Sequence, residues 1–219
     1  MIAVVDYGVN NLASVVRALR AGGHTADLTG DPDEVRRAER VLVPGVGNFG
    51  QASRTLAATG LGEAVREVAQ AGRPVMGICL GLQLFFEMSE EAPEARGMAL
   101  LPGRVRRFST GLPVPHVGWA QVDLTESGRR HPLVGPALGE SAQFFYHVHS
   151  YHPTSLPEGD VLATGDYGSN TDIPLFLARL VRPLAARDVG MAAVQFADRL
   201  RLPRQRMGRV RQSLRGGDE

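Results

Sequence analysis

Lysine is missing from this 219-residue chain, because all 24 of its basic residues are arginine. Without lysine, the chain cannot form a Schiff base, anchor pyridoxal phosphate or build a Walker P-loop. Cysteine is scarce as well: the single Cys79 excludes an intrachain disulfide and a cysteine-rich metal site, and it indicates a reducing compartment such as the cytoplasm. The formal net charge of +1 gives no reason to expect nucleic acid as a partner.

Long apolar runs are also missing. No stretch approaches the length needed to cross a membrane, and the N-terminal segment Met1–Asp6 lacks the basic start of a signal peptide. We therefore expect a cytoplasmic protein that does not bind a membrane. With 43% hydrophobic residues, the chain can still bury one ample core.

The first half of the chain alternates between strand and helix patterns. Short apolar runs at residues 2–5, 40–43 and 74–79 are separated by segments with helical spacing, which predicts βαβ units and a parallel sheet. The expected fold is α/β: an open, mostly parallel, flavodoxin-like sheet flanked by helices, with an antiparallel, hairpin-rich second half. The extended segments expected in that second half are Val114–Leu124, Phe144–Tyr151, Asp160–Tyr167 and Leu175–Val181.

The most informative stretch is Gly77–Gly81, with the sequence Gly-Ile-Cys-Leu-Gly, where an apolar strand runs into a segment of helical spacing. A strand-to-helix turn lifts its central side chain out of the sheet, and flanking glycines permit the close backbone approach that this turn needs. We expect the helix to continue to about Met88, so that its N-terminus favours the Cys79 thiolate and the Leu80 N–H stabilises an oxyanion. The alternative is a buried structural cysteine.

Together with other motifs, this stretch resembles the class I, triad-type glutamine amidotransferases and, more narrowly, the glutaminase subunits of imidazole glycerol phosphate synthases. The likeness extends from residue 1 to about residue 168. It is carried by Asp6-Tyr7-Gly8, Asn10-Asn11, Pro44 to Phe49, Gly77 to Gln83, Leu101 to Val105, Pro115 to Trp119 and Val148 to Tyr151.

The resemblance implies that Cys79 attacks the carboxamide of glutamine, releases ammonia and leaves a γ-glutamyl thioester that water hydrolyses. It places the oxyanion hole at the backbone of Gly47 and Leu80. It assigns glutamine binding to Gly45, Gln83, Ser150 and Tyr151. No cofactor and no metal are implied.

The resemblance also implies a partner, a (β/α)8-barrel cyclase subunit that joins the chain as a heterodimer. Ammonia passes to this partner through a protein channel and is used in histidine biosynthesis. The positions expected to face the partner are Tyr7, Asn10, Asn11, Pro115, His116 and Trp119.

The chain departs from the family near its C-terminus. Where relatives complete the triad with His and Glu after Val-Gln-Phe, this chain has Ala197 and Arg199. Alanine cannot titrate and arginine cannot accept a proton, so neither replaces a general base. We expect residues 1–196 to form one amidotransferase domain and 197–219 an arginine-rich tail. The tail is either disordered or the product of a reading-frame error.

Three nearby histidines are alternative candidates for the missing base. On one continuous strand His147 and His149 share a face and His152 takes the opposite one. The favoured explanation is that they are ordinary strand and loop histidines close to the glutamine pocket, because the resemblance gives no reason to expect a base there.

Three functions remain open on the sequence. The first is an ammonia-producing glutaminase subunit. The second is a catalytically defective homologue that binds the cyclase without hydrolysing glutamine. The third is another flavodoxin-like protein with a single cysteine, against which the motifs at Pro115–Trp119 and His149–Tyr151 argue.

Overall fold

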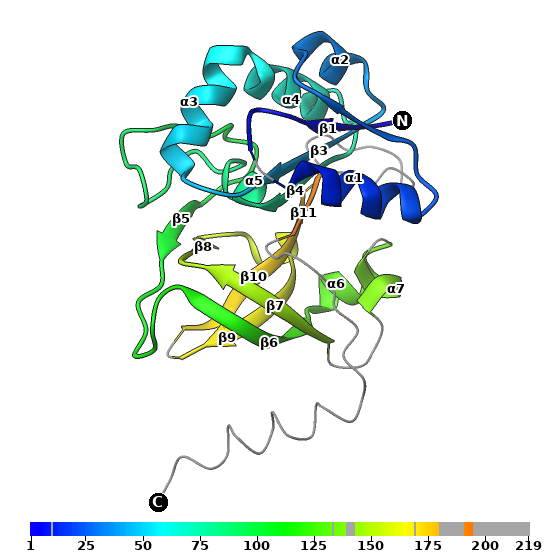
Figure 1. The fold of residues 1–219 in the computed structure, drawn as a ribbon. Coiled ribbons are helices and arrows are strands. Elements are labelled where there is room, and N and C mark those ends of the chain that lie inside the picture. The colour runs from blue at the N-terminus through cyan, green and yellow to red at the C-terminus, as the bar shows by residue number, and fades with distance from the viewer. Residues whose placement is uncertain (10, 133, 139–142, 169, 180–190, 195–219) are drawn as a thin grey trace, which may run out of the picture.

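The computed structural model describes residues 1–9, 11–132, 134–138, 143–168, 170–179 and 191–194, which form a nine-stranded sheet and a two-stranded ribbon (Figure 1). The strand order of the large sheet is β2-β1-β3-β4-β11-β10-β9-β6-β7. One half of this sheet is parallel and the other antiparallel, so the fold class predicted from the sequence is confirmed. Within these described residues, no helix is long and apolar enough to span a membrane.

Five neighbouring strands make the parallel half. They are β2 (Ala26–Thr29), β1 (Ile2–Val5), β3 (Arg40–Gly45), β4 (Val75–Cys79) and β11 (Met191–Val194). The chain passes from β1 to β2 on one side of β1 and then crosses to β3 on its other side. A reversal of strand order of this kind opens a crevice at the carboxyl ends of the strands. Tyr7, Gly45 and Cys79 lie at or just after those ends.

Helices cover both faces of the parallel half, because its strands are apolar on both faces. Val4 and Leu42 form a cluster with Val16 of α1 on one face, whereas Val5 and Val43 join the larger core under the other helices. The helices are α1 (Leu12–Ala21), α2 (Pro32–Arg37), α3 (Phe49–Thr59) and α4 (Leu61–Gln70).

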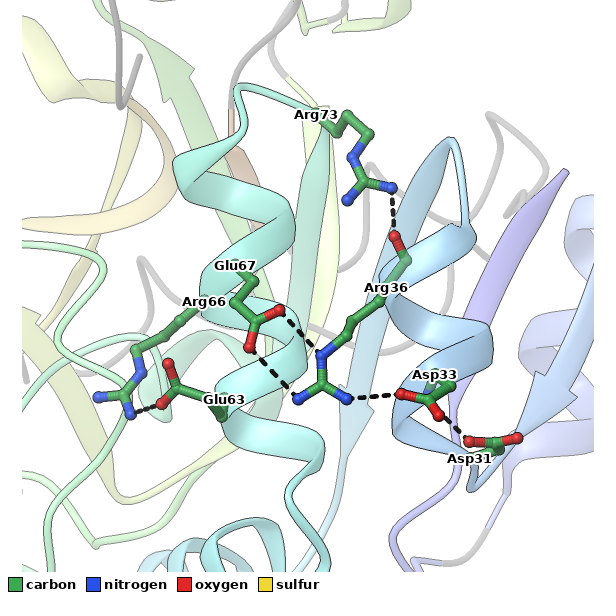
Figure 2. Close-up of polar contacts among 7 residues, drawn as sticks. All are labelled: Asp31, Asp33, Arg36, Glu63, Arg66, Glu67 and Arg73. Carbon is green, nitrogen blue, oxygen red and sulfur yellow. Dashed lines mark hydrogen bonds and ion pairs between the residues drawn. The ribbon is translucent and has the colours of Figure 1, made fainter.

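Charged side chains join α2 to α4 at the surface (Figure 2). The Arg36 guanidinium donates to the two carboxylate oxygens of Glu67 at 2.8 and 3.3 Å, and to Asp33 at 2.8 Å. Arg73, which follows α4, donates to the backbone carbonyl of Arg36 at 2.7 Å. The contact between these helices is therefore polar at its rim and apolar beneath.

The antiparallel half extends the sheet beyond β11 around a second core of Phe108, Val122, Phe145 and Leu162. Its strands overlap the four extended segments predicted from the sequence, although β10 begins five residues before the predicted Leu175 and residues 180–181 lie outside the described residues. The strands are β6 (His116–Leu124), β7 (Gln143–His149), β9 (Val161–Tyr167) and β10 (Asn170–Arg179). Shorter elements complete this region: β5 (Arg104–Arg107) paired with β8 (Tyr151–Thr154), helices α6 (Glu126–Arg130) and α7 (Val134–Leu138), and the 3₁₀ turn η1 (Glu158–Asp160).

The helix predicted after Cys79 is much shorter than expected. Helix α5 covers only Leu80–Gln83. Beyond it, the carbonyls of Leu84 and Phe85 accept hydrogen bonds from the backbone of Met98 and Leu100, both at 2.7 Å, so the chain folds back on itself. These long-range bonds replace the i→i−4 bonds that would have continued the helix.

Candidate active site at the Cys79 elbow

Cys79 lies at the turn from β4 into α5 with φ 55° and ψ −115°. A positive φ is uncommon for a residue with a side chain and costs on the order of 1–3 kcal/mol, so the surrounding fold must hold it there. Strain of this kind is typical of a nucleophile elbow, in which the side chain is raised above the sheet. Cys79 is partly exposed in this position. The sequence-based prediction of an elbow is confirmed in its geometry.

Glycines allow the two sides of the elbow to approach. A Cβ on Gly81 would overlap the carbonyl oxygen of Val43 on the neighbouring strand, and a Cβ on Gly77 would lie 2.7 Å from the backbone of Leu82. Gly45 pairs with Cys79 in the register of β3 and β4, and a Cβ there would lie 2.8 Å from the Gly81 nitrogen. Glycine at these three positions is therefore required by contact distance.

Tyr7 forms the floor next to the elbow. Its hydroxyl donates to the Pro44 carbonyl at 2.8 Å, and it would meet a Cβ placed on Gly45. Burial, and secondly the charge of an ionised Cys79, raise the pKa of the Tyr7 phenol well above its usual range. Tyr7 is therefore a neutral donor packed under the site.

Burial raises the pKa of the Cys79 thiol, and the Leu80 backbone N–H, which stabilises the thiolate, offsets this only in part. The predicted contribution of the helix N-terminus is present at the Leu80 N–H, but burial outweighs it. The physical reason is the short α5, since one turn of helix provides little dipole, whereas desolvation acts on the whole sulfur. Cys79 needs a base, or a substrate that closes over it, before it can attack.

The residues predicted to form the oxyanion hole come from two segments, the start of α5 and the loop after β3. Leu80 follows Cys79 directly, and its N–H is oriented towards the sulfur. Gly47 lies in the exposed loop between β3 and α3 with φ 114° and no atom within 4 Å of a Cβ placed on it. This backbone conformation is available to glycine and strained for other residues.

The predicted glutamine-binding residues come from three elements. Gln83 is buried in α5. Ser150 links β7 to β8, where its carbonyl accepts a hydrogen bond from the Phe108 N–H at 3.0 Å. Tyr151, at the start of β8, packs against the hydrophobic cluster that includes Leu80. The segment after β7 thus packs against the same hydrophobic core as the elbow.

The positions predicted to face a partner divide into three groups. Pro115 and Asn11 are exposed and Trp119 is half-buried against Tyr146, with ring centroids 5.7 Å apart. Tyr7 and His116 are buried, each residue being 6% exposed, so little of either is accessible to a partner in this chain alone. Position 10, an asparagine, lies outside the described residues.

The predicted triad positions Ala197 and Arg199 lie outside the described residues, as does the predicted tail at 197–219. What the structure does show is the end of β11. Val194 is paired with Ile78 on the parallel strand β4, so β11 ends at the same edge of the sheet at which Cys79 is presented.

The three candidate base histidines are buried with His116. Burial lowers the pKa of His147 to about 3 and that of His149 to about 4, so both imidazoles are neutral near pH 7. His152 does not take the opposite face of one strand, because the chain turns at Ser150, and it stacks on Phe108 at 4.8 Å while His149 meets the same ring at 5.0 Å. Sequence reasoning missed this grouping, because His116 is distant in the chain.

Comparisons with known proteins find matches over about three quarters of the chain. A family model described as glutamine amidotransferase class-I matches residues 3–171. The imidazole glycerol phosphate synthase subunit HisH of Moorella thermoacetica is 44% identical over 167 residues, covering 76% of this chain and 77% of that protein. The HisH subunit of Symbiobacterium thermophilum is 46% identical over 168 residues, covering 76% of each chain.

Two solved structures show the same fold at low sequence identity. The crystal structure of a glutamine amidotransferase has a TM-score of 0.66 at 18% identity and covers 90% of both chains. The structure of PurLQS from Thermotoga maritima has a TM-score of 0.63 at 16% identity, covering 88% of this chain and 84% of that one. The residues matched by the family model end before Ala197 and Arg199.

Proposed function

The chain belongs to the class-I glutamine amidotransferase family, and we propose that it is the glutaminase subunit of an imidazole glycerol phosphate synthase. The single observation that carries this proposal is the Cys79 elbow, a thiol held at positive φ at the carboxyl edge of a parallel sheet. The HisH relatives, which are similar over three quarters of the chain, supply the narrower assignment. The substrate we propose is glutamine, and the location is the cytoplasm.

In the proposed reaction, the Cys79 sulfur attacks the side-chain carbonyl carbon of glutamine. The carbon–sulfur bond forms, the carbonyl oxygen takes up the negative charge, and the N–H groups of Leu80 and Gly47 stabilise that oxyanion. The carbon–nitrogen bond then breaks, ammonia leaves with an added proton, and water hydrolyses the thioester to glutamate. Because burial raises the thiol pKa, the proton on sulfur must be taken by a base during attack.

We propose that the ammonia is used by a (β/α)8-barrel cyclase subunit, with which this chain forms a heterodimer. The docking surface we propose is the outer face of the paired strands β6 and β7. Val117 and Val148 are a cross-strand pair there, 54% and 53% exposed, beside the pair of Trp119 and Tyr146. Two adjacent apolar pairs at the β7 edge of the sheet form a surface suited to a protein partner.

A second candidate function rests on the sequence at the triad positions. Ala197 and Arg199 leave no group for proton transfer there, which favours a homologue that binds the cyclase and does not hydrolyse glutamine. We retain 1–196 as the amidotransferase domain and 197–219 as a separate arginine-rich tail. Sequencing of the gene's 3′ end tests the frame: a second frame encoding His-Pro-Glu after Phe196 would return the chain to the active class.

An electrophilic glutamine analogue tests the proposed function, because Cys79 is the single thiol of the chain. We expect mass spectrometry to find the label on Cys79 in the cyclase-bound protein, and excess glutamine to prevent it. A general thiol reagent serves as the control for access. A Cys79 that reacts with the general reagent and never with the glutamine analogue would contradict glutamine binding at the elbow. The two candidate functions are then separated by turnover, since both bind glutamine and only one releases ammonia.

A further inference from the structure

Three buried imidazoles come together on one face of the paired strands β6 and β7, in the antiparallel half. The antiparallel register pairs His116 directly with His149. His147 is two residues before His149 on β7 and therefore points to the same face. The grouping thus follows from strand register, and it lies on the opposite face of these strands from the exposed Val117 and Val148.

The nitrogen atoms of this trio are close together. His147 Nδ1 and His149 Nε2 are 3.3 Å apart, and one ring nitrogen from each of the three histidines lies within 4.8 Å of the others. Two imidazole nitrogens bound to one tetrahedral zinc, each at about 2.0–2.1 Å, would be separated by roughly 3.3–3.4 Å. The observed pair already has this spacing.

A small cavity adjoins the trio. Its volume is about 10 Å³, and it is lined by the three histidines together with Asp166 of β9 and a few apolar groups. About 10–15 Å³ is the space that one water molecule occupies, so a single ion also fits. Asp166 is exposed, so the donor atoms that meet here are the three imidazole nitrogens.

The hydrogen bonding of His149 leaves its Nε2 as the ring nitrogen that faces His147. Its Nδ1 lies 3.0 Å from the Tyr151 carbonyl oxygen, which can only accept, so Nδ1 carries the proton. Nε2 therefore presents its lone pair towards His147. A backbone carbonyl that binds the far N–H in this way is the usual support of a metal-binding imidazole.

We propose that His116, His147 and His149 bind one divalent transition-metal ion, with Zn²⁺ as the best fit to the all-imidazole donor set, and that a water molecule completes its coordination. The rings of His116 and His147 are stacked, with planes 7° apart and centroids 4.9 Å apart. Two parallel rings cannot direct their in-plane lone pairs at one point, so His116 rotates inward on binding. The metal joins β6 to β7 and is separate from Cys79, because no residue of β4 or α5 is among those lining the cavity.

The competing explanation is aromatic packing together with one hydrogen bond between His147 and His149. Phe108 and Tyr167 also contact these rings, Tyr167 stacking on His116 at 3.9 Å. Packing accounts for burial of the rings, and a hydrogen bond from His147 Nδ1–H to His149 Nε2 accounts for the 3.3 Å spacing without a metal. A metal titration separates the two explanations.

The test uses the full chain with any affinity tag removed and with Cys79→Ser, so that no thiol competes for metal. We expect Co²⁺ to bind with 1:1 stoichiometry and the visible absorption of a tetrahedral site, Zn²⁺ to displace it, and Zn²⁺ to raise the melting temperature. His147→Gln should weaken binding by about 100-fold or more. His152→Gln is the matched control, because His152 is buried and stacked on Phe108 but lies outside the trio.

Several results would overturn the proposal. One is a parent chain that binds no Co²⁺ at a defined stoichiometry and gains no thermal stability from Zn²⁺, which would leave aromatic packing as the explanation. Another is equal affinity in the His147→Gln and His152→Gln variants, which would place the metal elsewhere. If His147→Gln does not fold, His116→Gln replaces it, and the spectrum of the parent chain still decides the question.

Discussion

The parallel and antiparallel halves of the molecule organise their chemistry in different ways. In the parallel half, the backbone makes the site: Cys79 is placed by strained dihedrals, and glycines on three sides let the neighbouring chain approach. In the antiparallel half, side chains make the site, since the grouping of His116, His147 and His149 comes from the pairing of β6 with β7. A backbone-built site is encoded locally in one short motif. A side-chain-built site depends on strand register, which brings distant segments together.

The largest effect is expected from placing a base and an acid at the triad positions 197 and 199. The double substitution Ala197→His with Arg199→Glu should raise glutaminase turnover in the cyclase complex by on the order of 10⁴–10⁶-fold, because a triad base and its orienting acid contribute about this much. At about 1.4 kcal/mol per decade, this is roughly 5–8 kcal/mol of barrier. Steady-state glutamate release measures it, with ammonia-dependent cyclase turnover as the reference.

Two controls sharpen this prediction. Ala197→His alone should recover only part of the rate, because an imidazole without a carboxylate is neither oriented nor stabilised when protonated. Adding Cys79→Ser to the double variant should remove the gain. Near-normal turnover in the unmodified chain would refute the account, since another residue would then be supplying the base.

The second effect tests the backbone of the elbow. Gly81→Ala should lower the free energy of unfolding by about 3 kcal/mol, since its Cβ would overlap the Val43 carbonyl, which is held in the sheet. Gly111→Ala is the matched control, because a Cβ there meets nothing within 4 Å, and its effect should stay within about 0.5 kcal/mol. Denaturant unfolding of both variants measures the difference. Equal stabilities would mean that the elbow relaxes at little cost.

This contrast also explains how far the sequence could predict the structure. Gly-Ile-Cys-Leu-Gly predicted the elbow because every residue needed for the turn is within five positions. The length of α5 was not predictable locally. Leu80, Leu82, Leu84, Phe85 and Phe86 are all buried, so the apolar run has no helical period, and the backbone bonds that end the helix come from Met98 and Leu100.

The burial of Tyr7 and His116 likewise could not be predicted from the sequence. Tyr7 is buried because Pro44 and Gly45, distant in the chain, leave room for its ring and an acceptor for its hydroxyl. His116 is buried because Tyr167 and His147 stack against it. In both cases an aromatic or polar side chain is placed by long-range neighbours, whereas the extended segments themselves were predicted from turn residues alone.

The third effect concerns the outer face of the antiparallel half. Trp119→Ala should weaken association with the cyclase roughly 30-fold, about 2 kcal/mol, because buried aromatic anchors dominate interface energies. Leu28→Ala is the matched control, since Leu28 is also an exposed apolar residue, 44% exposed, but lies on β2 at the other edge of the sheet. Titration calorimetry measures both. Equal affinities for the two variants would show that the docking surface lies elsewhere.

The fourth effect is the pH dependence of the Cys79 thiol. Burial raises its folded pKa, so the thiol is protonated near pH 7 and its alkylation rate should rise about tenfold per pH unit through the range where an ordinary cysteine levels off. The same chain unfolded in denaturant is the control, because its single cysteine then has an ordinary pKa. Stopped-flow alkylation gives both profiles. A folded-state rate that is already constant near neutral pH would show a thiolate and reverse the sign of this shift.

The smallest effect is expected at the surface of the parallel half, where Arg36 bridges α2 and α4 (Figure 2). Arg36→Ala should lower the melting temperature by a fraction of the Gly81→Ala loss, because Arg36 and Glu67 are 35% and 44% exposed and water screens such a pair. Arg37→Ala is the matched control, since it removes an exposed arginine from the same helical turn. The excess loss in Arg36→Ala should shrink at high ionic strength, because salt screens exposed charges. A salt-independent loss as large as that of Gly81→Ala would mean that side chains, and not the backbone, hold the parallel half together.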